Sequence, residues 1–310
     1  SAWHDELSIW TDTIKKSPAS PQALVNLGVT HLRHNQPEKA LEYFTRARAV
    51  APRSTQVYNN MGTALYALGR YDEAIKAQER ALQLDPHSAE AHSNLGILYK
   101  QRGDLDRAAA FFEKAISLKP TFTVPYIHLG FLHADAGRFD EALKTLDRGL
   151  SALPNSSSLC NAQGVVYEKM NRSEDAMKCY QKAADLDPYN YEARNNLVLC
   201  LIREKEFRQA LPFALQAAQL CRDAPELFLN LGIIYMNLGR LSEAAAAYRE
   251  AIRLNEHYAD AYFNLGVCLL GMKGREKESI RHFEKVLEIK PDYPNREVIL
   301  KIIKRLKALP

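Results

Sequence analysis

Asparagine side chains recur along this chain at a constant distance, which makes them the first candidates for shared chemistry. Each amide offers a hydrogen-bond donor and an acceptor, and a peptide backbone presents the same pair of groups. A row of such amides could therefore hold an extended polypeptide with little regard for its side chains. The series lies on multiples of 34 residues and comprises Asn26, Asn60, Asn94, Asn196, Asn230 and Asn264, with His128 and Ala162 in the two intervening places.

Side chains that could catalyse a reaction or bind a metal lack the spacing that such chemistry needs. His31 and His34 have no obvious third ligand nearby, and His128 and His133 are too far apart to share a helix face. The sequence contains no glycine-rich phosphate loop and no nucleophile beside a base. We expect a protein that is not an enzyme and that uses no cofactor and no metal.

The cysteines do not indicate a disulfide framework or a zinc site, because their number is odd and no CxxC pair occurs. We expect buried thiols, since an unpaired cysteine behaves as a small hydrophobic residue. The five are Cys160, Cys179, Cys200, Cys221 and Cys268.

The elements that position the asparagines follow from the same 34-residue period. Glycine recurs on it from Gly28 to Gly164, and proline from Pro18 to Pro188. If the glycine is numbered position 8, positions 4, 7 and 11 share one face of a first helix, and positions 20, 24 and 27 share one face of a second. Position 15 is mostly Gly or Asn, which tolerate a left-handed turn, and proline at position 32 ends the second helix.

This pattern resembles the tetratricopeptide signature over nearly the whole chain. The resemblance implies an all-α fold, a right-handed superhelical solenoid of antiparallel helix pairs. Residues 21–292 are predicted to form eight repeats, between a half-repeat capping helix over 1–20 and a C-terminal capping helix over 293–310. The repeats are predicted to start at Pro21, Thr55, Ala89, Thr123, Ser157, Tyr191, Pro225 and Ala259.

Repeat six departs from the pattern. It has Val198 at position 8, Lys205 at position 15 and Arg222 in place of the usual proline, and Pro212 falls inside its second helix. Proline removes a helix hydrogen bond, so a kink is expected there. Drift in a tolerant array and a functional bend are both open interpretations.

The resemblance also implies a concave groove lined by the first helix of each repeat, with position 6 facing it. The predicted peptide site comprises the six asparagines with Tyr66, Phe131 and Phe263. The series is similar to the asparagine ladder of nucleocytoplasmic O-GlcNAc transferases, which holds substrate polypeptides. Two alternatives stay open: asparagine is common at position 6 of the repeat consensus, and groove aromatics also pack against neighbouring repeats. No carboxylate clamp is expected, because positions 5 and 6 carry no Lys or Arg.

We therefore expect a protein or peptide partner. The net charge of +4 is too small to indicate nucleic acid, and no apolar run is long enough to span a membrane. A purely structural assembly scaffold is a further alternative.

The N-terminal segment carries a second, shorter resemblance. Trp3, Asp5, Trp10 and the Lys-Ser-Pro ending at Pro18 are similar to the junction in membrane-anchored O-mannosyltransferases that carry tetratricopeptide repeats. This implies the repeat domain of a larger protein, tethered to a membrane domain, that presents acceptor protein outside the cytoplasm. The alternative is a plain half-repeat cap. The unpaired thiols favour the cytoplasm, so the compartment stays open.

Overall fold

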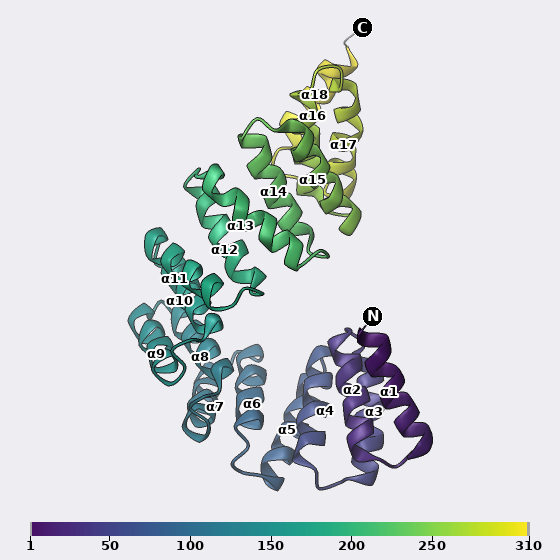
Figure 1. Cartoon of the computed structure of the whole chain (residues 1–310), viewed down its shortest axis with the longest axis vertical. Helices are drawn as coiled ribbons and strands as arrows, with labels where there is room; N and C mark the ends of the chain where they lie inside the picture. Colours follow the sequence, from purple (N-terminus) through teal and green to yellow (C-terminus); the bar gives the residue numbers. More distant parts are fainter. Residues whose placement is uncertain (1, 309–310) are drawn as a thin grey trace. The chain divides into compact units, whose positions relative to one another are not determined.

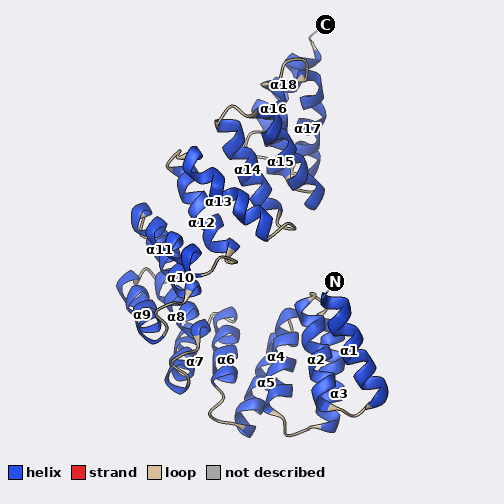
Figure 2. Ribbon diagram, in the orientation of Figure 1, coloured by secondary structure: helices blue, strands red, loops and turns tan. Residues whose placement is uncertain are grey.

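The structure is a computed structural model that describes residues 2–308, with side chains from residue 7 onward. The described residues form helices and no strand (Figure 2). This confirms the predicted all-α class of paired helices. The helices are α1 (Ala2–Lys16), α2 (Pro21–Arg33), α3 (Pro37–Val50), α4 (Thr55–Ala67), α5 (Tyr71–Leu84), α6 (Ala89–Gln101), α7 (Leu105–Leu118), α8 (Thr123–Asp135), α9 (Phe139–Ala152), α10 (Ser157–Lys169), α11 (Ser173–Leu186), α12 (Tyr191–Arg203), α13 (Phe207–Leu220), α14 (Pro225–Asn237), α15 (Leu241–Leu254), α16 (Ala259–Leu270), α17 (Glu276–Ile289) and α18 (Arg296–Lys307).

The chain divides into two compact units, Ser1–Ala162 and Gln163–Pro310. Within each unit a helix packs mainly against the helices that precede and follow it in the chain, as the antiparallel neighbours in Figure 1 show. Such contacts between neighbours are typical of repeat proteins, in which each helix pair buries its apolar face against the next. Each unit is described by itself below.

The helix pairs approach closely because a glycine on the first helix faces a large side chain on the second. A Cβ atom on Gly28 would lie 2.3 Å from the Phe44 ring, and one on Gly96 would lie 2.5 Å from the Phe112 ring. Both rings are fully buried. Position 8 must therefore be small wherever position 24 is large.

Repeat six keeps this fit with a medium-sized residue at position 8 and a small residue at position 24. Val198 stands at position 8, and the residue opposite it at position 24 is Ala214. Both are buried, with exposed fractions of 1% and 3%. The total volume is preserved, which cores tolerate well. Val198 is thus a compensated substitution, and α13 runs unbroken through Pro212.

The turns inside the repeats have the left-handed backbone that position 15 predicts. Glycine adopts it in five repeats, in repeat eight at Gly274, and Asn35 and Asn171 adopt it with φ of 54° and 57°. In repeat six the residue is Lys205, with φ of 62°.

Candidate functional site

In the first unit, three of the predicted site residues, Asn60, Tyr66 and Asn94, lie on α4 and α6, the first helices of the predicted repeats two (residues 55–88) and three (residues 89–122). Asn60 and Asn94 line one polar cavity of about 430 Å³. Both asparagines are half-buried. The cavity is lined by Thr55, Gln56, Asn59, Asn60, Thr63, Asp85, Ser88, Glu90, Asn94 and Phe122.

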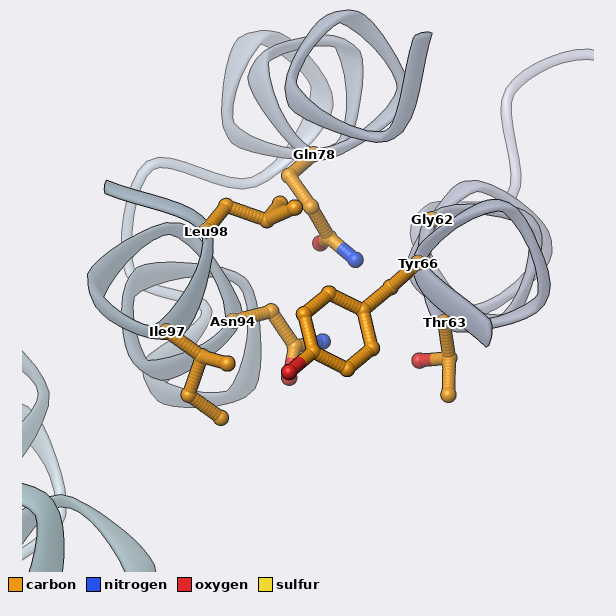
Figure 3. A pocket seen from close by; sticks show the side chains of 7 residues that line it. All are labelled: Gly62, Thr63, Tyr66, Gln78, Asn94, Ile97 and Leu98. Atoms are coloured by element: carbon orange, nitrogen blue, oxygen red, sulfur yellow. The ribbon is translucent and has the colours of Figure 1, made fainter. Parts of the chain in front are cut away.

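A second cavity, of about 210 Å³, adjoins the first, because Thr63 and Asn94 line both. Figure 3 shows the Tyr66 ring in the middle of this space, facing Asn94. The lining combines apolar walls with the end of a glutamine, and it comprises Gly62, Thr63, Tyr66, Gln78, Asn94, Ile97 and Leu98. The two cavities share lining residues and form one candidate site on α4 and α6.

N-cap serines fix where the two helices begin and so where these side chains lie along each helix. Ser54 and Ser88 accept hydrogen bonds from the backbone N–H groups of Val57 and Ala91, which fixes where α4 and α6 begin. Because both helices start at the same point of the repeat, position 6 occupies the same place on each helix. Asn60 and Asn94 therefore lie one repeat apart and line the same cavity.

Gln78 also lines the smaller cavity, although the sequence pattern did not single it out as a candidate site residue. It stands at position 24 of repeat two, where most other repeats carry Phe, Tyr or Leu, and this exception is visible in the sequence. Its side chain is fully buried, and its Nε2 donates to the Asn59 carbonyl oxygen at 3.0 Å. Its Oε1 is buried and accepts no hydrogen bond.

The charged groups at the rim of the polar cavity are already engaged. Lys119 Nζ donates to Glu90 at 2.8 Å, and this hydrogen bond lowers the pKa of the Glu90 carboxyl. The Asp85 carboxylate accepts the backbone N–H of His87 at 3.0 Å. The surface that remains for a ligand consists of neutral amides, hydroxyls and apolar side chains.

The other predicted residues of this unit lie outside the two cavities. The Asn26 amide accepts a hydrogen bond from Gln22 at 3.0 Å on the same helix, and Phe131 is half-buried. His128, which interrupts the asparagine series, stacks on Phe112 with ring centroids 5.6 Å apart. Burial lowers its pKa, and the Lys100 charge adds to this.

In the second unit, Asn230 engages the neighbouring repeat. Its exposed fraction is 6%, and its Nδ2 donates to Asn195 Oδ1 at 2.8 Å. Asn196 and Asn264 are half-buried. Phe263 contacts the Tyr293 ring at 5.4 Å, so this aromatic side chain packs inside its own unit.

The cysteine prediction holds in part. No disulfide joins the cysteines, and Cys160, Cys200 and Cys268 are buried. Cys179 and Cys221 are partly exposed, which the prediction of burial missed. Burial raises the pKa of the Cys200 thiol to about 12, and nearby Glu168 contributes.

Between residues 2 and 308 no cluster of His, Cys, Asp and Glu could hold a metal ion. No described helix is long and apolar enough to cross a membrane.

Tetratricopeptide-repeat family models match residues 21–54, 54–121, 100–162, 157–190 and 229–294. Together these matches cover most of the chain, and the chain belongs to the tetratricopeptide-repeat family. Repeats of this family are protein–protein interaction modules.

Among individual proteins, the chain is similar to the Protein O-mannosyl-transferase TMTC3 of Mus musculus, with 27% identity over 148 residues, which is 42% of this chain. It covers 16% of the length of that relative. It is also similar to human Tetratricopeptide repeat protein 6, with 31% identity over 128 residues, 40% of this chain and 24% of the relative.

Two solved structures show the same fold. YrrB, described as a TPR protein with an unusual peptide-binding site, matches with a TM-score of 0.52 and 23% identity, over 65% of this chain and all of that one. A human IFIT1 dimer matches with a TM-score of 0.64 and 16% identity, over 94% of this chain and 73% of that one.

Proposed function

We propose that this protein–protein interaction module binds an extended polypeptide along the groove side of α4 and α6. The observation that carries the proposal is the polar cavity of about 430 Å³ that Asn60 and Asn94 line together. Two amides one repeat apart offer donor–acceptor pairs to peptide groups along an extended backbone. Such a grip depends on main-chain groups, and adjacent pockets would add side-chain preference.

The proposal is tested with the double variant Asn60→Ala/Asn94→Ala and a library of random peptides displayed against the full chain. We expect the parent protein to enrich peptides that bind without a fixed charge pattern. Removing both amides should weaken binding of a selected peptide roughly thirtyfold to 150-fold, at about 1–1.5 kcal/mol for each of two lost hydrogen bonds. Affinity would be measured by calorimetry.

Gln83→Ala is the matched control, because Gln83 lies exposed on α5, outside both cavities. Its binding should equal that of the parent. If the parent enriches no peptide, or if the double variant binds as tightly as Gln83→Ala, the groove between α4 and α6 is not the peptide site.

We propose a second role at the level of the complete protein, which the similarity to TMTC3 favours. As the repeat region of a membrane-bound glycosyltransferase, this module would present acceptor polypeptides to a catalytic domain elsewhere in the same protein. The full-length gene provides the test. Upstream hydrophobic segments of membrane-spanning length would support the role, and a complete reading frame without them would exclude it.

A further inference from the structure

Repeat two replaces an apolar packing residue by a buried amide. In the other three repeats of the first unit, position 24 is Phe44, Phe112 or Leu146, and each is fully buried against a glycine of the first helix. Gln78 occupies the same place and is also fully buried. Nothing in the packing of a helix pair requires a polar group there.

The orientation of the Gln78 amide follows from its hydrogen bond. Its Nε2 lies 3.0 Å from the carbonyl oxygen of Asn59, which can only accept. Turning the amide over would bring two acceptors together, so Oε1 is the atom that remains without a donor. Figure 3 shows the amide end of Gln78 directed from α5 into the space between Leu98, Asn94 and the Tyr66 ring.

We propose that this cavity is a specificity pocket for one tyrosine or tryptophan side chain of the bound polypeptide, with Gln78 Oε1 as the acceptor for its O–H or N–H. The inference rests on the proposed function, because it assigns a side-chain preference to the same groove. It adds a chemical class of ligand that the asparagine pair alone does not select.

The size and walls of the cavity define that class. A volume of about 210 Å³ corresponds to roughly seven waters at ~30 Å³ each, so it suits one large side chain. Ile97, Leu98 and the Tyr66 ring give it apolar walls, which favour an aromatic body. No carboxylate lines it, so lysine or arginine would be desolvated there without a counter-charge.

Tyr66 is the movable wall. Its exposed fraction is 37%, the highest among the lining residues that are large and hydrophobic. Exposed side chains change rotamer within nanoseconds, so the ring can turn outward while the core residues of α4 stay packed. This movement would bring a ligand donor within reach of the buried Gln78 oxygen.

The first test uses the random-peptide selection on the full chain. We expect tyrosine or tryptophan to be enriched at one position of the selected peptides. Replacing that residue by phenylalanine in a selected tyrosine peptide removes only the donor, and it should weaken binding about fivefold to tenfold, the usual contribution of one neutral hydrogen bond.

The second test removes the acceptor with Gln78→Leu. Leucine already fills position 24 of repeat four, where Leu146 packs on Gly130, so the variant is expected to fold. Circular dichroism and thermal unfolding would check this. In Gln78→Leu the tyrosine and phenylalanine peptides should bind within about twofold of each other. Gln83→Leu, the same change on the exposed side of α5, should keep the parent preference.

The outcomes separate this inference from the function on which it rests. The specificity pocket is refuted if the parent binds peptides but enriches no tyrosine or tryptophan, or if Gln78→Leu retains the preference for tyrosine over phenylalanine. Either result leaves the proposed peptide site on α4 and α6 unaffected. If the parent binds no peptide at all, both are refuted.

Discussion

The turn between the two helices of a repeat depends on a single residue with a left-handed backbone. Glycine adopts this conformation without steric strain, whereas a residue with a Cβ atom does so at a cost of about 1–2 kcal/mol. Lys205 is exposed and has φ of 62°, so repeat six carries this strain without an evident packing gain.

Lys205→Gly should therefore stabilise the protein. We expect the free energy of unfolding to rise by about 0.5–1 kcal/mol, since part of the relieved strain is offset by the flexibility of glycine in the unfolded chain. Urea unfolding would measure it. Lys205→Ala removes the same charge and keeps the strain, so an equal gain in both variants would contradict the explanation.

At the scale of the element, Val198 at position 8 and Ala214 at position 24 together explain how the helix pair α12–α13 packs without the glycine of the other repeats. Ala214→Phe alone should overpack the pair and destabilise it by roughly 1–3 kcal/mol. Val198→Gly alone leaves a cavity and a helix glycine, at a cost of roughly 2–3 kcal/mol.

The double variant Val198→Gly/Ala214→Phe restores the glycine–aromatic contact of the other repeats. We expect its destabilisation to be at least ~1 kcal/mol smaller than the sum of the two single effects. Chemical unfolding of the four proteins gives this coupling energy directly. Additive effects would show that positions 8 and 24 do not pack against each other in this repeat.

Repeat six also carries a buried guanidinium. Arg194 has an exposed fraction of 9% and donates to the carbonyl oxygens of Ala184, Asp187 and Asn190 at 3.1–3.3 Å. A cation is favourable at the C-terminal end of a helix, where carbonyl groups lack partners. Arg194 thereby caps the C-terminal end of α11.

We propose that the first and last helices are end caps. In α18, Ile299, Ile303 and Leu306 are buried while Lys304 and Arg305 stay exposed, and the helix packs against α17. The helix α1 packs against α2. Polar outer faces at the ends of a repeat stack keep it soluble.

At the scale of the whole molecule, both units contain histidines whose pKa is lowered by burial. They include His92, His128 and His133 in the first unit and His282 in the second. Their pKa in the folded state lies below the unfolded value of about 6.5. As the pH falls through 6.5, the unfolded chain binds protons first, so the free energy of unfolding decreases.

We therefore expect stability to be constant around neutral pH with respect to these groups and to decline as the pH drops below about 6.5. Urea unfolding at a series of pH values would show it. His128→Asn removes one such group and restores the position-6 residue of the other repeats, so its stability should fall less steeply. A slope identical to the parent would exclude His128 as a contributor.

Much of the fold could be predicted from the sequence because the packing of a repeat is local. The period of 34 residues, the glycine at position 8 and the left-handed position 15 each describe contacts between helices that are neighbours in the chain. The candidate site was less accessible to such reasoning. The row of asparagines predicted a ladder interrupted at His128 and Ala162, and it could not show that Asn230 donates to Asn195 whereas Asn60 lines an open cavity.

The sequence by itself determined the repeat, the helix pairs and the position-6 series, since these depend on residue types at fixed spacing. Only the tertiary structure decided which amides line a cavity and which form a hydrogen bond with a neighbouring helix. It also showed that Gln78 leaves an acceptor unpaired beside the Tyr66 ring. The physical reason is that hydrogen-bond satisfaction depends on the atoms of adjacent helices, and a one-dimensional pattern does not contain their distances.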